Sequence, residues 1–348
     1  MTKFLDTRGL RHALAMVLAL FVAISGSSCE RFMDGEGYCP TVYKIKFRFT
    51  MNMLNADAFP TNVKSVSLFA FNKEGECVRV FTESSEILAD ENYAMEVDLP
   101  AGTYDFVAWC GLDGNEDFSL AESDNPKIKD DLVCTLAHGT RAGSDKECRK
   151  NLHPLWHARL DDVELPADQE GEAIVGTMYL TKNTNTVRVI LHHIKGKELL
   201  PHDYDFTITD DNSIMNWDNS LMEADTTTYR EFSKRSTVVK MPDQDDGEYE
   251  AYSSLVAELD VARLVKEGHG KPYLTVTHPE VKAPVLRIPL IDLLLIAKGE
   301  ARLDMDDQEY LDRQDEYNLI FFMDDAGWYM NGGIWINSWH IRDFSFNM

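Results

Sequence analysis

Residues 41–51 read TVYKIKFRFTM, and this stretch decides the class of fold. Its basic residues share one parity, and its large apolar residues share the other, namely Tyr43, Ile45, Phe47, Phe49 and Met51. Successive side chains of a β-strand point to opposite faces, so a period of two predicts a strand that is buried on one face only.

Comparable short segments recur outward along the chain, separated by turn signals. The expected strands are residues 62–72, 93–99, 103–110, 173–180, 186–193, 204–209, 248–259, 273–277, 284–290, 317–323 and 334–348. Residues 111–150 are rich in Asp, Asn, Gly and Lys and are interpreted as a long connection. One short helix is expected at Leu290–Lys298, because few windows hold a 3.6-residue period for three turns. The chain is therefore predicted to be all-β, built from β-sandwiches.

The chain has 348 residues and a formal net charge of −25, with 44% hydrophobic residues. This length suits about two domains. The acidic, proline-containing segment 160–172 marks the expected boundary, so the predicted domains are residues 29–164 and 165–348. The strong negative charge argues against a nucleic-acid partner and against adsorption to anionic lipid.

Residues 1–28 are predicted to be a cleaved signal peptide. Lys3, Arg8 and Arg11 precede the twelve-residue apolar run Ala13–Ile24, which is too short to span a bilayer as an anchor. Small residues then lead to Cys29, an arrangement that resembles a bacterial lipobox, although Gly26 stands where leucine is usual. Lipidation of Cys29 is therefore predicted, with ordinary cleavage nearby as the alternative. No later stretch is long and apolar enough to span a bilayer.

The other five cysteines all lie before residue 150 and show no C-x-x-C spacing; they are Cys39, Cys77, Cys110, Cys134 and Cys148. That spacing argues against a zinc ribbon or a thioredoxin-like site. In an exported protein, two alternatives remain open for these cysteines: a disulfide between Cys134 and Cys148, or buried free thiols.

No catalytic motif is present, and no cofactor or metal site is expected. His153 and His157 are four residues apart, but Pro154 follows the first and no third ligand lies near in sequence. The loop acids are interpreted as solvated, although paired carboxylates of a hydrolase depend on the fold rather than on sequence spacing. Trp335 and Trp339 suit sugar stacking or, given their isoleucine neighbours, core packing.

The last segment changes parity twice, which predicts bulges near Ser338 and Asp343 or a strand that switches sheets. Its apolar residues fall into three pairs of alternating parity: Ile334 and Ile336, then Trp339 and Ile341, then Phe344 and Phe346.

Eight segments in order resemble the fimbrillin-associated anchor lipoproteins, the FimB-like family of Bacteroidales. They are Val42–Met51, Val63–Phe71, Leu99–Trp109, Leu152–Leu160, Asp292–Leu295, Gln308–Asp315, Glu316–Met323 and Ile334–Trp339. The resemblance covers essentially the whole mature chain. It implies two tandem transthyretin-like β-sandwich domains in a non-enzymatic fimbrial subunit, anchored in the outer membrane at the cell surface through lipid on Cys29.

The family also implies that fimbrial structural subunits are the partners, and that subunits engage by exchange of β-strands. The terminal strand is then either intramolecular or a donor, and its candidate partner-strand residues are Ile334, Ile336, Trp339, Ile341, Phe344 and Phe346. The alternative function is a surface lipoprotein that binds glycans.

Overall fold

The computed structural model describes residues 41–121, 126–137, 139–140, 146–167, 171–242, 249–280, 283–301, 303–324, 327–328, 334–337 and 339–341. Two compact units are distinguished, one formed by residues 1–42 with 168–173 and the other by residues 43–167 with 174–348. In the first unit, the Val42 N–H donates to the Gly171 carbonyl at 3.0 Å. The predicted signal peptide, Cys29, Cys39, Phe344 and Phe346 lie outside the described residues.

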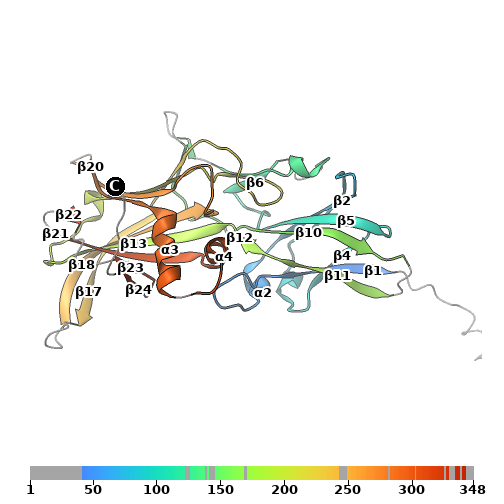
Figure 1. Cartoon of the computed structure of the whole chain (residues 1–348), viewed down its shortest axis with the longest axis horizontal. Coiled ribbons are helices and arrows are strands. Elements are labelled where there is room, and N and C mark those ends of the chain that lie inside the picture. The colour runs from blue at the N-terminus through green and yellow to red at the C-terminus, as the bar shows by residue number, and fades with distance from the viewer. Residues whose placement is uncertain are drawn as a thin grey trace, which may run out of the picture. The chain divides into compact units, whose positions relative to one another are not determined.

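The first half of the chain forms two sheets (Figure 1). One has the order β11 (Glu172–Tyr179), β1 (Val42–Arg48), β4 (Ala94–Val97). The other has the order β12 (Thr181–Lys182), β10 (Trp156–Leu165), β5 (Gly102–Cys110), β2 (Val66–Phe71), β3 (Cys77–Glu83).

Two larger sheets consist mainly of strands from the second half of the chain, with two short strands from residues 139–148 added to one of them. One has the order β17 (Ser233–Pro242), β18 (Tyr249–Ala262), β13 (Thr184–His193), β21 (Glu316–Asp324), β23 (Ile334–Ile336), β24 (Trp339–Ile341), with β22 (Gly327–Trp328) also paired to β21. The other has the order β20 (Ala283–Pro289), β19 (Tyr273–His278), β14 (Asp205–Asp210), β16 (Thr227–Arg230), β9 (Lys146–Cys148), β8 (Gly139–Thr140).

Small elements complete the structure. A three-stranded sheet has the order β15 (Ile214–Met215), β7 (Cys134–Leu136), β6 (Phe118–Leu120). The helical segments are α2 (Phe59–Asn62), α3 (Leu290–Glu300), α4 (Asp307–Arg313) and the 3₁₀ turns η1 (Glu86–Ala89), η2 (Lys129–Asp131) and η3 (Pro201–Asp203). The fold is thus mostly β with few short helices, and its sheets are consistent with β-sandwich domains.

The alternation predicted for residues 41–51 is present in β1, where Tyr43, Ile45 and Phe47 are buried. Phe47 stacks on Phe59 of α2 with ring centroids 5.7 Å apart. Every second side chain of β1 is buried, and the basic residues between them lie on the opposite face of the strand. Only one face of β1 therefore packs against the core.

β13 is the central strand of the largest sheet. It pairs antiparallel with β18 from Thr184 to His192 and parallel with β21 from Thr186 to His193. Its side chains Val187 and Val189 are fully buried, and Leu191 nearly so. The chain reaches β13 directly from β11 and β12, so residues 172–193 contribute strands to three sheets in succession.

Three sequence predictions are corrected. The single expected helix, Leu290–Lys298, is α3, but α4 is a second one, begun by Asp306, whose carboxylate accepts the Glu309 N–H at 2.7 Å. Residues 111–150 contain β6 to β9 rather than a plain connection. β3 and β10 were not predicted, and neither were β16 and β17, whose polar sequences lack a clear period.

In the described part of the terminal segment, β23 and β24 form a hairpin rather than one bulged strand. β23 and β24 pair antiparallel, with Ile336 opposite Trp339 and Ile334 opposite Ile341. Asn337 between them has φ of 54°, a conformation that asparagine tolerates in tight turns. The first change of parity, between Ile336 and Trp339, therefore comes from a reversal of chain direction between β23 and β24.

Of the two alternatives left open for Cys134 and Cys148, the structure has free thiols and no disulfide between them. Cys77, Cys110, Cys134 and Cys148 are free thiols, and the last three are buried. Cys134 pairs across the ladder with Met215, and Cys148 with Tyr229, so the two cysteines belong to different sheets. Burial raises the pKa of the Cys148 thiol to about 11, which keeps this thiol protonated at neutral pH.

A matched pair of leucine substitutions tests the placement of the core. Leu259 on β18 is fully buried, whereas Leu54 is 85% exposed. Leu259→Ala should lower the free energy of unfolding by about 2–5 kcal/mol because it leaves a cavity. Leu54→Ala should change it by less than about 0.5 kcal/mol. Urea unfolding of both variants measures the difference, and equal losses would contradict this placement of the core.

Candidate partner-binding surfaces

The predicted partner-strand residues lie at one end of the largest sheet. Ile334 and Ile336 belong to β23, and Trp339 and Ile341 belong to β24. β23 pairs with β21, with Ile336 opposite Leu319 and Ile334 opposite Phe321. Its pairing is therefore within the chain, while a donor role for the six residues stays a prediction.

A polar clasp fixes the turn of this hairpin. The Asn337 N–H donates to the Asn318 carbonyl at 2.7 Å, and the Asn318 N–H donates to Asn337 Oδ1 at 2.9 Å. The Asn318 side chain in turn accepts from Arg188 at 2.8 Å. The two bonds between Asn318 and Asn337 hold the hairpin on β21, so moving it would break both of them, while the Arg188 bond joins β21 to β13.

A loop around Trp217 is held against β10 and η2. The Trp217 indole N–H donates to Asp130 at 3.0 Å, and the Lys129 ammonium lies 4.9 Å from the centre of the Trp217 ring. The Trp217 carbonyl accepts from His157 Nε2 at 2.7 Å. Burial is the main cause that lowers the pKa of His157 to about 4, so the ring is neutral at pH 7.

Buried amides and an ion pair hold the same region. Asn183, just before β13, and Asn219 exchange side-chain hydrogen bonds of 2.7 and 3.1 Å, and both are buried. Arg263 donates to both carboxylate oxygens of Asp312 at 3.0 and 2.9 Å and also bonds the Asn219 carbonyl. The side chains of Asn183, Asn219 and Arg263 thus all have partners, which removes most of the cost of burying them.

The two histidines considered for a metal site are separate. His153 Nδ1 lies 2.7 Å from Asp117 Oδ2, whereas His157 bonds the Trp217 carbonyl. Burial would raise the pKa of Asp117, but hydrogen bonds from Lys150 and His153 outweigh it and lower that pKa. Within the described residues, no group of three or more His, Cys, Asp or Glu side chains could hold a metal ion.

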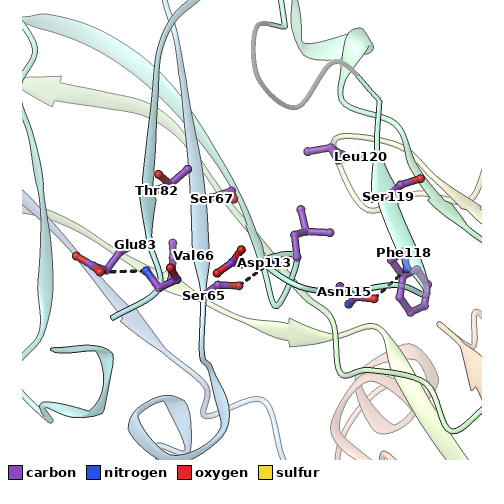
Figure 2. A pocket seen from close by; sticks show the side chains of 12 residues that line it. Ser65, Val66, Ser67, Thr82, Glu83, Asp113, Asn115, Phe118, Ser119 and Leu120 are labelled. Atoms are coloured by element: carbon purple, nitrogen blue, oxygen red, sulfur yellow. Dashed lines mark hydrogen bonds between the residues drawn. The ribbon is translucent and has the colours of Figure 1, made fainter. Parts of the chain in front are cut away.

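A pocket of about 450 Å³ lies between β2 and β3 on one side and β6 on the other (Figure 2). Hydroxyl groups of Ser67, Thr82 and Ser119 line it, together with the acidic residues Glu83 and Asp113. Two bonds shape its walls: the Asp113 N–H donates to Ser65 Oγ at 3.1 Å, and Glu83 accepts the Ser85 N–H at 2.8 Å.

The pocket combines polar groups that can bond sugar hydroxyls with apolar side chains such as Leu112 and Leu120. Hydrogen bonds from Ser85 are the main cause that lowers the pKa of Glu83, which keeps this wall negatively charged. The tryptophans proposed for sugar stacking do not line it. Among the described helices, none has the length and hydrophobicity needed to cross a membrane.

These sheets are consistent with β-sandwich domains, and the comparisons with known proteins specify the class of protein. Residues 36–344 match the family of Fimbrillin-A associated anchor proteins Mfa1 and Mfa2, so the chain belongs to this family. The resemblance predicted from the sequence is therefore confirmed. The family is non-enzymatic in kind, and its membership implies association with fimbrial subunits and a fimbrial location at the cell surface. No curated protein is a significant match to this chain.

Several solved structures are similar. A candidate adhesin from Bacteroides thetaiotaomicron is 31% identical with a TM-score of 0.75, over 86% of this chain and 97% of that chain. A structure of candidate polysaccharide-binding proteins from the same species is 28% identical with a TM-score of 0.73, over 89% and 100%. The fimbrial anchor protein Mfa2 from Porphyromonas gingivalis, at 19% identity, shares the fold with a TM-score of 0.63, over 88% and 100%.

Because His157 is buried and neutral, we expect the stability of the fold to fall at acidic pH. Its pKa is about 6.5 in the unfolded chain and about 4 in the folded one, so the unfolded state binds more protons between these values. Protonation of His157 should therefore contribute about 2–3 kcal/mol to the fall in the free energy of unfolding as the pH drops from 6.5 to 4. Denaturant unfolding as a function of pH measures this slope.

His157→Gln should reduce the slope without abolishing it, because burial also lowers the pKa of His192 to about 4. The control is His202→Gln, since the His202 side chain is 78% exposed and should leave the slope as in the wild type. A His157→Gln profile identical to the wild type would contradict the assigned role of this histidine.

Proposed function

We propose that this chain is a lipid-anchored accessory or anchor subunit, which attaches a fimbria to the outer membrane through lipid on Cys29. The observation that carries the proposal is the family match over residues 36–344, which begins seven residues after that cysteine. The basic flank, the short apolar run and the small residues before Cys29 add support from the sequence.

In this proposal two tandem transthyretin-like domains, residues 29–164 and 165–348, form the body of the subunit. Partner subunits engage by β-strand addition, with the terminal residues from Ile334 to Phe346 as the candidate partner strand. An added strand supplies a ladder of backbone hydrogen bonds, and alternate side chains give specificity. The clasp between Asn318 and Asn337 means that β23 must first leave β21 if it is to serve as a donor.

Lipidation is tested by labelling cells with a palmitate analogue. The wild type should carry the label and fractionate with the outer membrane, because the acyl chains partition into the bilayer. Cys29→Ala should lose the label and appear in the soluble fraction. Cys77→Ala is the matched control, since this thiol lies within β3 and should not affect labelling. Equal labelling of the wild type and Cys29→Ala would refute lipid anchoring.

A second candidate function is glycan binding, which the polar pocket between β2, β3 and β6 favours. The similarity to candidate polysaccharide-binding proteins at 28% identity adds support. In this alternative Ser67, Thr82 and Ser119 bond sugar hydroxyls, while Leu112 and Leu120 contact the apolar face of the ring.

A glycan array followed by calorimetry tests this alternative. Asp113→Asn and Ser119→Leu should each lower the affinity for a bound oligosaccharide about tenfold. Asp113→Asn weakens a hydrogen bond to the sugar, and Ser119→Leu removes a hydroxyl group and fills part of the pocket. Glu91→Gln, an exposed acid that does not line the pocket, should bind as the wild type does. Absence of any array signal, or equal affinity of all three variants, would remove glycan binding as a function.

A further inference from the structure

The outer face of the sheet that contains β14, β16 and β19 carries an array of threonines. Alternate side chains of these strands, such as Ile208 and Leu274, are fully buried, so the others face outward. Five of the outward residues are threonines, and all five are partly exposed. We call them the threonine face: Thr207 and Thr209 on β14, Thr228 on β16, and Thr275 and Thr277 on β19.

Strand pairing places these threonines side by side. Thr207 stands opposite Thr275, and Thr209 stands opposite Thr228. Outward residues of one strand are about 6.7 Å apart, and neighbouring strands are about 4.8 Å apart. The hydroxyl groups therefore repeat at regular intervals in two directions across three strands.

The hydroxyl groups of the threonine face are not used by the fold. Among the described residues, no hydrogen bond joins any of the five to the rest of the protein. The outer face of β13 and β18 differs, since Arg188 there donates to Glu258 at 2.8 Å. The preference of threonine for strands does not account for this scarcity of charged pairs on the threonine face. Each hydroxyl group can both donate and accept a hydrogen bond, so the face can bond an external ligand.

Charged side chains at the margin of the threonine face are mostly paired. Arg230, which stands opposite Thr207, forms an ion pair with Glu147. The Lys234 ammonium lies 3.6 Å from a carboxylate oxygen of Asp205. These pairs leave the centre of the face without a strong field of either sign, although the chain as a whole has a net charge of −25.

Arg287 is the exception at this margin. It stands opposite Thr275, and it has no ion pair with another described residue. Its guanidinium carbon lies 3.6 Å from the centre of the Tyr273 ring, so the planar group is held on the aromatic face. The guanidinium N–H groups add donors beside the threonine hydroxyls.

This composition distinguishes between classes of ligand. Nucleic acid and anionic lipid require several cations, whereas Arg287 alone is unpaired among the described residues here. Protein interfaces centre on aromatic and aliphatic side chains, and Tyr273 is the only large apolar residue that β14, β16 and β19 direct outward. A neutral glycan instead presents repeated hydroxyl groups that donate and accept hydrogen bonds, as the threonines do.

We propose that the threonine face binds a neutral, linear polysaccharide. The inference rests on the second candidate function, glycan binding, and assigns it to a surface other than the pocket between β2, β3 and β6. The threonine hydroxyls bond successive sugars, and Arg287 donates further hydrogen bonds at the margin. Each such bond contributes little, so a polymer that engages several of them at once binds more tightly than a monosaccharide.

The double variant Thr207→Val with Thr275→Val tests the face. Valine keeps the branched shape and the strand preference of threonine, so the melting temperature should stay that of the wild type. The immobilised full mature chain is exposed to pullulan, glucomannan and laminarin, which are neutral, and to polygalacturonate, which is acidic. The wild type should bind at least one neutral polymer, and the double variant should bind it about tenfold more weakly on a biosensor.

A second double variant, Thr209→Val with Thr228→Val, should also lower the affinity, because it removes the neighbouring pair of hydroxyl groups. Thr177→Val is the matched control, since Thr177 is a partly exposed threonine of β11 outside the threonine face. Thr82→Val removes a hydroxyl group from the pocket. Both single variants should bind the polymer as the wild type does.

Weaker binding by Thr82→Val, with both double variants unchanged, would overturn the threonine face and leave glycan binding at the pocket. Tighter binding of polygalacturonate than of every neutral polymer would overturn the neutral ligand. Absence of binding to all four polymers would overturn the inference, whereas the anchoring role is tested separately by palmitate labelling.

Discussion

The pairing of β13 on both of its edges is the constraint on which the second half of the structure depends. Nine backbone pairs to β18 and eight to β21 hold this strand. Its parallel partner β21 is more than a hundred residues away in sequence, so the sheet cannot form from local hairpins alone. Buried side chains such as Val187 and Val189 then fix the register, because a slip by one residue would move them to the opposite face.

Polar groups rather than apolar ones determine how the chain enters that strand. Asp260 on β18 accepts the Thr186 hydroxyl at 2.7 Å and the Leu152 N–H at 2.8 Å. Burial is the main cause that raises the pKa of Asp260, so the carboxyl is costly to ionise there. Together with the paired amides of Asn183 and Asn219, it makes this junction specific, because any other packing would leave these groups unsatisfied.

The sequence predicted those elements whose side chains alternate between core and solvent. Residues 42–48 alternate, and the prediction of β1 was therefore right. β17 was not predicted, because an edge strand next to solvent does not require a periodic sequence. α4 escaped because its seven residues are too few for three helical turns. The hairpin at Asn337 was read as a bulge, since sequence parity alone does not distinguish an extra residue from a reversal of direction. Surface features such as the pocket between β2, β3 and β6 depend on long-range pairing, so no local sequence pattern predicts them.

Acidity and edge protection act together in this chain. A net charge of −25 disfavours contact between copies of the chain, which lessens the need for protection at every sheet edge. A long regular edge such as that of β17 is therefore tolerable where a strong overall charge suppresses self-association. A subunit that joins a larger assembly needs this combination, because association with the correct neighbour must compete with aggregation at the same unpaired backbone groups.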